Sequence, residues 1–98
     1  MAYKAAIMGT GKYLPDKIVT NFDLEKLVDT NSDWIKARTG INERRIVSKG
    51  QASAEMSTNA ILDLMDNCEI LPNEIDAIIV ATITPDMMFP ATAAIIQK

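Results

Sequence analysis

The stretch Ile75-Asp76-Ala77-Ile78-Ile79-Val80-Ala81-Thr82-Ile83 is an almost unbroken apolar run near the carboxyl end of the chain. It shows no alternation of apolar and polar residues, which is the pattern of a parallel strand covered on both faces. An amphipathic helix is predicted before it, because apolar residues recur at helical spacing from 54 to 68. A buried strand beside an amphipathic helix favours an α/β architecture.

Shorter patterns extend this order in both directions. They predict a strand over 3–10, short helices over 21–28 and 32–39, a strand over 41–48, and a last helix from Ala91 to Lys98. A fully buried strand needs a neighbour on each edge, and these residues offer few. We therefore expect a truncated chain, or one whose sheet is covered by another chain.

The predicted helix ends rest on capping residues. Thr20 with Asp23, and Thr30 with Asp33, have the spacing of capping boxes. Ser53 is the expected N-cap of the 54–68 helix.

The composition is that of a globular protein, with 98 residues, 48% hydrophobic and 23% charged. The net charge of −3 argues against nonspecific nucleic-acid binding. With Cys68 as the one cysteine and no histidine, neither a disulfide framework, a thiolate zinc site nor a Ser-His-Asp or Cys-His pair can form within these residues. No apolar run approaches the roughly 18 residues of a membrane span. We expect a cytoplasmic protein that binds neither metal nor membrane.

Two local features have an obvious functional interpretation and a plainer structural one. Gly9-Thr10-Gly11 follows a predicted strand, but a dinucleotide-binding fingerprint would need a third glycine where Leu14 stands. A tight turn is the favoured interpretation. Cys68 lies near the end of its helix, where the dipole raises a thiol pKa, so a structural cysteine is favoured over a nucleophile.

Thr30, Trp34 and Arg38 form the most informative group, because their spacing of four residues predicts one helix face. An indole offers a flat stacking surface, and a guanidinium binds phosphate with two parallel hydrogen bonds. Together they suit a ligand with an aromatic base and phosphates. The alternative is a core tryptophan beside a solvated arginine. The window 36–49 is basic. It has one acidic residue, Glu43, and five basic ones, which are Lys36, Arg38, Arg44, Arg45 and Lys49. It could attract phosphates or an acidic partner, or form a solvated strand face.

Met87, Met88 and Phe89 follow the predicted buried strand, where ligands of open α/β sheets tend to bind. Three large apolar residues in such a loop suggest an interface or an acyl pocket. Local capping of the core is the alternative.

The sequence also resembles a known family, in register over nearly all 98 residues. The chain resembles the amino-terminal part of the 3-oxoacyl-(acyl-carrier-protein) synthase III family. The motifs that carry the resemblance are Gly9-Thr10-Gly11 with Tyr13-Leu14-Pro15, Thr20-Asn21, Asp23-Leu24-Glu25, Val28-Asp29-Thr30, Asp33-Trp34-Ile35, Arg38-Thr39-Gly40-Ile41, Glu43-Arg44-Arg45, Ile75-Asp76, Val80-Ala81-Thr82, Thr84-Pro85-Asp86 and Phe89-Pro90.

The resemblance implies that residues 1–98 are an incomplete amino-terminal half of a thiolase-like fold, layered α-β-α-β-α in the complete enzyme. It implies that the catalytic cysteine, histidine and asparagine lie beyond Lys98, so that this chain carries no catalytic residue and is inactive alone. Cys68 does not match the nucleophile. The complete enzyme would condense an acyl-CoA with malonyl carrier protein, with loss of carbon dioxide, to prime fatty-acid synthesis.

The same resemblance implies that Thr30, Trp34 and Arg38 contact the nucleotide end of coenzyme A, with Trp34 stacked on the adenine. Phe89 would reach across a homodimer to shape the partner's acyl pocket, with Met87 and Met88 nearby. Acyl-CoA and acyl carrier protein are then the expected partners, coenzyme A thioester is a substrate, and no cofactor is expected. A stand-alone module that binds coenzyme A or a nucleotide without catalysis is the alternative.

Overall fold

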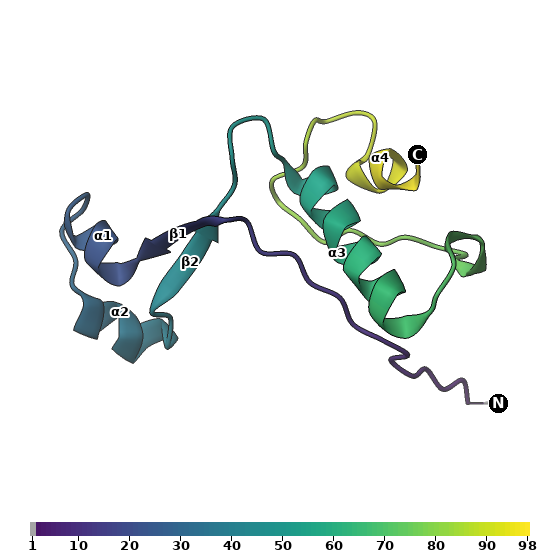
Figure 1. The fold of residues 1–98 in the computed structure, drawn as a ribbon, viewed down its shortest axis with the longest axis horizontal. Coiled ribbons are helices and arrows are strands. Elements are labelled where there is room, and N and C mark those ends of the chain that lie inside the picture. Colours follow the sequence, from purple (N-terminus) through teal and green to yellow (C-terminus); the bar gives the residue numbers. More distant parts are fainter. Residues whose placement is uncertain (1) are drawn as a thin grey trace. The chain divides into compact units, whose positions relative to one another are not determined.

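The computed structural model describes residues 2–98, which form two compact units (Figure 1). The first unit is Leu14–Gly50, and the second is Gln51–Lys98 together with the chain up to Tyr13. The elements, in chain order, are β1 Lys17–Thr20, α1 Asn21–Glu25, α2 Ser32–Thr39, β2 Glu43–Ile46, α3 Ser53–Cys68, the 3-10 turn η1 Pro72–Glu74 and α4 Thr92–Gln97. None of the helices over residues 2–98 has the length and apolar character needed to cross a bilayer.

The 14–50 unit is an antiparallel strand pair with two helices between the strands in sequence. β1 pairs with β2, so that Lys17 lies opposite Ile46 and Thr20 opposite Glu43. β1 was not predicted, because four residues between a bend at Asp16 and a helix cap are too few to show a period. β2 confirms the centre of the strand expected over 41–48.

α1 begins at the predicted capping box. The Thr20 hydroxyl oxygen accepts a bond from the Asp23 backbone N–H at 3.2 Å, and an Asp23 carboxylate oxygen accepts from the Thr20 backbone N–H at 2.9 Å. The helix ends at Glu25, three residues before the expected Val28. α2 has the predicted bounds, and Gly40 ends it in the left-handed conformation with φ of 71°.

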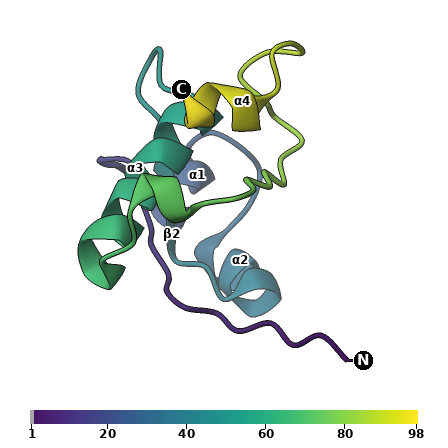
Figure 2. The ribbon, with the colours of Figure 1, turned by 90° about the vertical axis from the view of Figure 1, so that its right-hand side faces the viewer.

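The second unit is built around α3, whose bounds confirm the helix predicted over 54–68. α4 packs against α3, and the chain after η1 runs back alongside α3 (Figure 2). The expected N-cap is wrong by one residue: α3 starts at Ser53, and the N-cap residue is Ala52, which has no side chain able to accept a bond.

The two longest strand predictions, 3–10 and 75–83, are wrong for this structure. Neither stretch is a strand, because a strand requires hydrogen bonds to a neighbour, and none of residues 2–98 pairs with either stretch. Ile79 is 93% exposed and Ile83 is 98% exposed. Ile75–Ile83 therefore has the composition of a buried strand without the partners that would bury it.

Gly9 and Gly11 do not form the predicted turn. The chain from Gly9 to Tyr13 lies extended against α3, where a Cβ on Gly11 would stand 2.6 Å from the Leu64 backbone nitrogen. The Lys12 backbone N–H donates to the Asp63 carboxylate at 3.0 Å, and Gln51 Nε2 donates to the Tyr13 hydroxyl at 2.8 Å. Gly11 is needed because a side chain there would hold the two backbones apart.

We expect Gly11→Ala to lower the free energy of unfolding by about 1–3 kcal/mol, because its methyl group would overlap the backbone of α3. Gly9→Ala is the matched control, since the atoms nearest to its methyl group, Cys68 Sγ, Cys68 Cβ and Leu64 Cδ1, belong to side chains and not to backbone. Urea unfolding followed by circular dichroism measures both. Equal losses for the two variants would contradict close backbone packing at Gly11.

The Asp23 carboxyl has a pKa below its ordinary value of 3.8, chiefly because the Thr20 backbone and side chain donate to it, with Lys26 adding to the effect. The unfolded chain thus binds this proton more tightly than the folded chain does. The contribution of Asp23 to stability is complete above pH 3.8 and is lost as the pH falls through the lower pKa of the folded state.

We expect Thr20→Val to move the Asp23 pKa part of the way back, because the hydroxyl is lost while the backbone N–H remains. A carboxyl NMR titration measures this. Thr10→Val, the same change at an exposed threonine, should leave the Asp23 pKa where it is. An unchanged Asp23 pKa in Thr20→Val would argue against the capping contact.

Candidate functional site

α2 is a short helix whose start is capped by two side chains. The Asn31 carbonyl Oδ1 accepts from the Trp34 backbone N–H at 2.8 Å, and the Glu25 carboxylate accepts from the Ser32 backbone N–H at 2.7 Å. The N-cap is thus Asn31, and the capping box predicted for Thr30 and Asp33 is wrong. These caps satisfy backbone N–H groups that an eight-residue helix otherwise leaves open.

Trp34 and Arg38 lie together on the exposed side of α2. The Arg38 guanidinium carbon stands 5.7 Å from the centroid of the Trp34 ring, within the range of a cation–π contact. Trp34 is 56% exposed, whereas Ile35, the next residue, is buried. The structure therefore rejects the interpretation of Trp34 as a core residue and presents an indole and a guanidinium side by side to solvent.

Thr30 does not share this helix face. It precedes the Asn31 N-cap, so the spacing of four residues from Thr30 to Trp34 is not helical. Thr30 is half-buried, and no bond joins it to Trp34 or Arg38. The structure thus brings together two members of the predicted trio and leaves the third outside the helix.

The basic window is divided between structural and exposed charges. Arg44 donates from one nitrogen to the Val19 carbonyl at 3.2 Å and from the other to Asn21 Oδ1 at 2.7 Å. Arg45 donates to the Pro15 carbonyl at 3.0 Å. These two arginines hold the 14–50 unit together. The exposed cations of the window are Lys36, Arg38 and Lys49, and of these Arg38 lies beside the Trp34 ring.

Met87, Met88 and Phe89 form an exposed apolar loop in the second unit. Phe89 is 87% exposed and Met88 is 99% exposed, while Met87 is half-exposed. The loop is held by contacts to the start of α3. Asp86 Oδ1 accepts from the Ala54 backbone N–H at 2.8 Å, and the Ser53 hydroxyl donates to the Thr84 carbonyl at 2.8 Å. Asp86 thus supplies the cap that Ala52 lacks.

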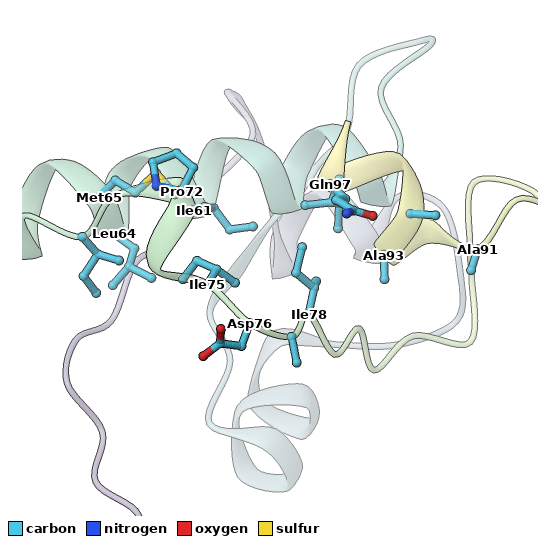
Figure 3. Close-up of a pocket in the computed structure, with 14 residues that line it drawn as sticks. Ile61, Leu64, Met65, Pro72, Ile75, Asp76, Ile78, Ala91, Ala93 and Gln97 are labelled. Atoms are coloured by element: carbon cyan, nitrogen blue, oxygen red, sulfur yellow. The ribbon is translucent and has the colours of Figure 1, made fainter.

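An apolar pocket of about 720 Å³ lies between α3, the chain after η1, and α4 (Figure 3). Its lining is mostly aliphatic, with Ile61, Leu64 and Ile78 among its residues, and Asp76 and Gln97 are polar exceptions. Such a lining offers few groups to orient a ligand.

The remaining groups that could mark a functional site are a cysteine, a buried hydroxyl and clusters of possible metal ligands. Cys68 is half-buried at the end of α3, and its Sγ lies close to Gly9, as expected for a packing residue. Thr92 is buried at the start of α4, and its hydroxyl finds no hydrogen-bond partner among residues 2–98. In that same part of the chain, His, Cys, Asp and Glu side chains form no group of three or more that could hold a metal ion.

We expect Asp86→Ala to lower the stability of α3 by about 1 kcal/mol, because the Ala54 N–H loses its acceptor. Asp86→Asn keeps an oxygen at the same position and should cost much less. Thermal unfolding and amide exchange of residues 53–56 measure the difference. A similar loss in both variants would show that charge, rather than the cap, is what Asp86 contributes.

This chain is similar in sequence to curated proteins that share one name. No protein-family model matches the chain. A curated beta-ketoacyl-[acyl-carrier-protein] synthase III from Caldanaerobacter subterraneus subsp. tengcongensis is 55% identical over 93 residues, which are 95% of this chain and 28% of the relative.

Solved structures agree in fold. The 3-oxoacyl-[acyl-carrier-protein] synthase III of Aquifex aeolicus matches 92% of this chain with 48% identity and a TM-score of 0.82, over 29% of its own length. The synthase III of Thermus thermophilus matches 95% of this chain with 40% identity and a TM-score of 0.84, also over 29% of its length. The chain spans little more than a quarter of these relatives. In sequence and in fold, it belongs to the beta-ketoacyl-[acyl-carrier-protein] synthase III family, of which it represents an amino-terminal segment.

Proposed function

We propose that this chain supplies the surface that binds the nucleotide end of coenzyme A in a condensing enzyme that primes fatty-acid synthesis. The relatives named above are synthases of this kind. The complete protein would transfer an acyl group from acyl-CoA to a cysteine. It would then join that group to malonyl carrier protein, which loses carbon dioxide and gives a 3-oxoacyl product. Acyl-CoA and acyl carrier protein are its proposed partners, with the thioester as substrate and no separate cofactor.

The observation that carries the proposal is the exposed pair Trp34 and Arg38. An indole ring stacks on a purine base, and base–aromatic stacking contributes about 1–3 kcal/mol per base. The guanidinium lies 5.7 Å from the ring centroid, so a phosphate attached to a stacked nucleotide comes within reach of a fixed positive charge. Thr30, just before the N-cap, is a third proposed contact for the same ligand.

The residues of this chain do not include the catalytic groups of such a reaction. The sequence has no histidine, and Cys68 is a half-buried residue at the C-terminal end of α3, with its Sγ close to Gly9. We infer that the nucleophile and its partners belong to the part of the family that this chain does not span, and that these 98 residues alone catalyse no condensation.

The loop at Phe89 supports a proposal for the acyl end of the substrate. Phe89 and Met88 present large apolar surfaces to solvent, which is costly unless a partner covers them. We propose that Phe89 contacts a second copy in a homodimer and that Met87 and Met88 lie near the acyl pocket. A cytoplasmic setting follows from the proposed substrates.

A stand-alone coenzyme A or nucleotide module is the second candidate function, and affinity separates the two. A surface that is only part of a site should bind weakly, with a dissociation constant of about 1 mM, which corresponds to roughly −4 kcal/mol. A complete module should bind at micromolar concentration or below.

We expect coenzyme A to quench the fluorescence of Trp34, the one tryptophan, in a weak but saturable titration of the 98-residue chain. Pantetheine, which lacks the nucleotide, should not quench at the same concentrations. Arg38→Ala should weaken binding at least tenfold, because a charged hydrogen bond to phosphate contributes about 1.5–3 kcal/mol, and about 1.4 kcal/mol is a factor of ten.

Lys49→Ala removes the same charge at an exposed position of the same unit and is the matched control. Saturation at micromolar coenzyme A would favour the module. No response of Trp34 to several millimolar coenzyme A, or equal effects of Arg38→Ala and Lys49→Ala, would overturn the proposed nucleotide surface.

A further inference from the structure

Asn21 is the most deeply buried polar side chain that the structure describes. It is the first residue of α1 and is 1% exposed. A buried amide without partners costs several kcal/mol, so its hydrogen bonds have to be made within the chain. Where these bonds go indicates what the residue holds in place.

The amide group of Asn21 is fully used. Its Nδ2 donates to the Ile41 carbonyl at 2.8 Å and to the Ser32 hydroxyl at 3.4 Å. Its Oδ1 accepts from the Arg44 guanidinium at 2.7 Å. Its backbone N–H also donates to the Asn42 carbonyl at 3.0 Å.

The two amide N–H bonds bracket α2. Ser32 is the first residue of that helix, and Ile41 directly follows the Gly40 C-cap. Both ends of the helix that presents Trp34 and Arg38 are therefore tied to one side chain of α1. Arg44, bonded to Asn21 Oδ1 and to the Val19 carbonyl, anchors that side chain to β2 and β1.

Packing alone holds α2 weakly. Ile35 is its one buried residue, and burial of a single isoleucine contributes about 1.5–3 kcal/mol without specifying the rotation of a helix about its axis. Hydrogen bonds at both ends do specify that rotation, because they have direction as well as distance.

We propose that Asn21 is a positioning residue, which orients α2 so that Trp34 and Arg38 face the ligand. The inference rests on the proposed nucleotide surface but goes beyond it, because it assigns a role to a residue that touches no ligand. Asn21 acts through α2, and Arg44 holds Asn21.

Asn21→Asp tests this link selectively. The carboxylate keeps an oxygen for Arg44 but loses both N–H donors, and it faces the Ile41 carbonyl with a negative charge. Asn42→Asp is the matched control: it makes the same chemical change on an exposed side chain of the same unit. We expect Asn21→Asp to weaken coenzyme A binding about five- to tenfold, and Asn42→Asp less than twofold.

A double variant separates positioning from loss of structure. If Asn21 acts through the Trp34–Arg38 surface, Asn21→Asp should add little to the loss already caused by Arg38→Ala. A simple loss of folded protein would lower binding by the same factor in both backgrounds. All titrations are made at a temperature where circular dichroism shows each variant to be folded. Additive losses in the double variant would overturn the inference.

Amide hydrogen exchange, measured without ligand, tests the positioning role of Asn21 independently of the proposed function. Asn21→Asp should speed exchange at Ile35 and Gly40, whose N–H groups bond within α2, while the β1–β2 amides keep their protection. Unchanged exchange in α2 would overturn the inference even if coenzyme A binds. If Asn21→Asp changes amide exchange in α2 but the unaltered chain does not bind coenzyme A, then the positioning role of Asn21 is supported and the proposed ligand is wrong.

Ser32→Ala provides a second variant should Asn21→Asp not fold. It removes only the longer of the two contacts to α2, so its effect on exchange and on binding should have the same direction and be smaller. A folded Ser32→Ala chain with α2 exchange slower than in the unaltered protein would contradict the proposed direction of the link.

Discussion

The satisfaction of one buried amide is the constraint on which the 14–50 unit depends. Asn21 is almost inaccessible to water, so each of its polar atoms has to be paired inside the chain. Those pairings reach α2, the segment that follows it, and β2. Ile35 is the one large apolar side chain buried among residues 14–50. Directed hydrogen bonds, more than a hydrophobic core, therefore fix the arrangement of this unit.

The second unit depends on a different device, which is close contact of backbone with a helix. Gly9 and Gly11 let an extended segment lie against α3, and Asp86 caps the start of the same helix from 32 residues away. α3 thus organises segments that are distant in sequence. The loop with Phe89 is held at its base and exposed at its tip, while α2 is held at both ends and exposes Trp34. In each unit, a segment held by hydrogen bonds presents exposed side chains to solvent.

Local patterns predicted local structure well. The bounds of α2, the extent of α3 and the Thr20–Asp23 capping box all follow from interactions within a few residues of the chain. Most of the predictions that failed depended on distant partners. Ser53 looks like an N-cap, but Asp86 caps α3 from 32 residues away. The Thr30 cap failed for a local reason, because Asn31, the next residue, caps α2. The strand predictions for 3–10 and 75–83 failed because pairing is a property of two segments, and a single pattern records only one.

The amino-acid sequence by itself determined the family and most of the helices, and it singled out Trp34 and Arg38 together with Thr30. These are matters of residue identity and short spacing. Tertiary structure alone decided that Thr30 stands apart from that pair, that Gly9 and Gly11 contact a helix rather than turn, and that Asn21 holds α2. The reason is physical: burial and hydrogen bonding depend on which segments are in contact, and contacts between residues far apart in the chain produce no periodic pattern in the sequence.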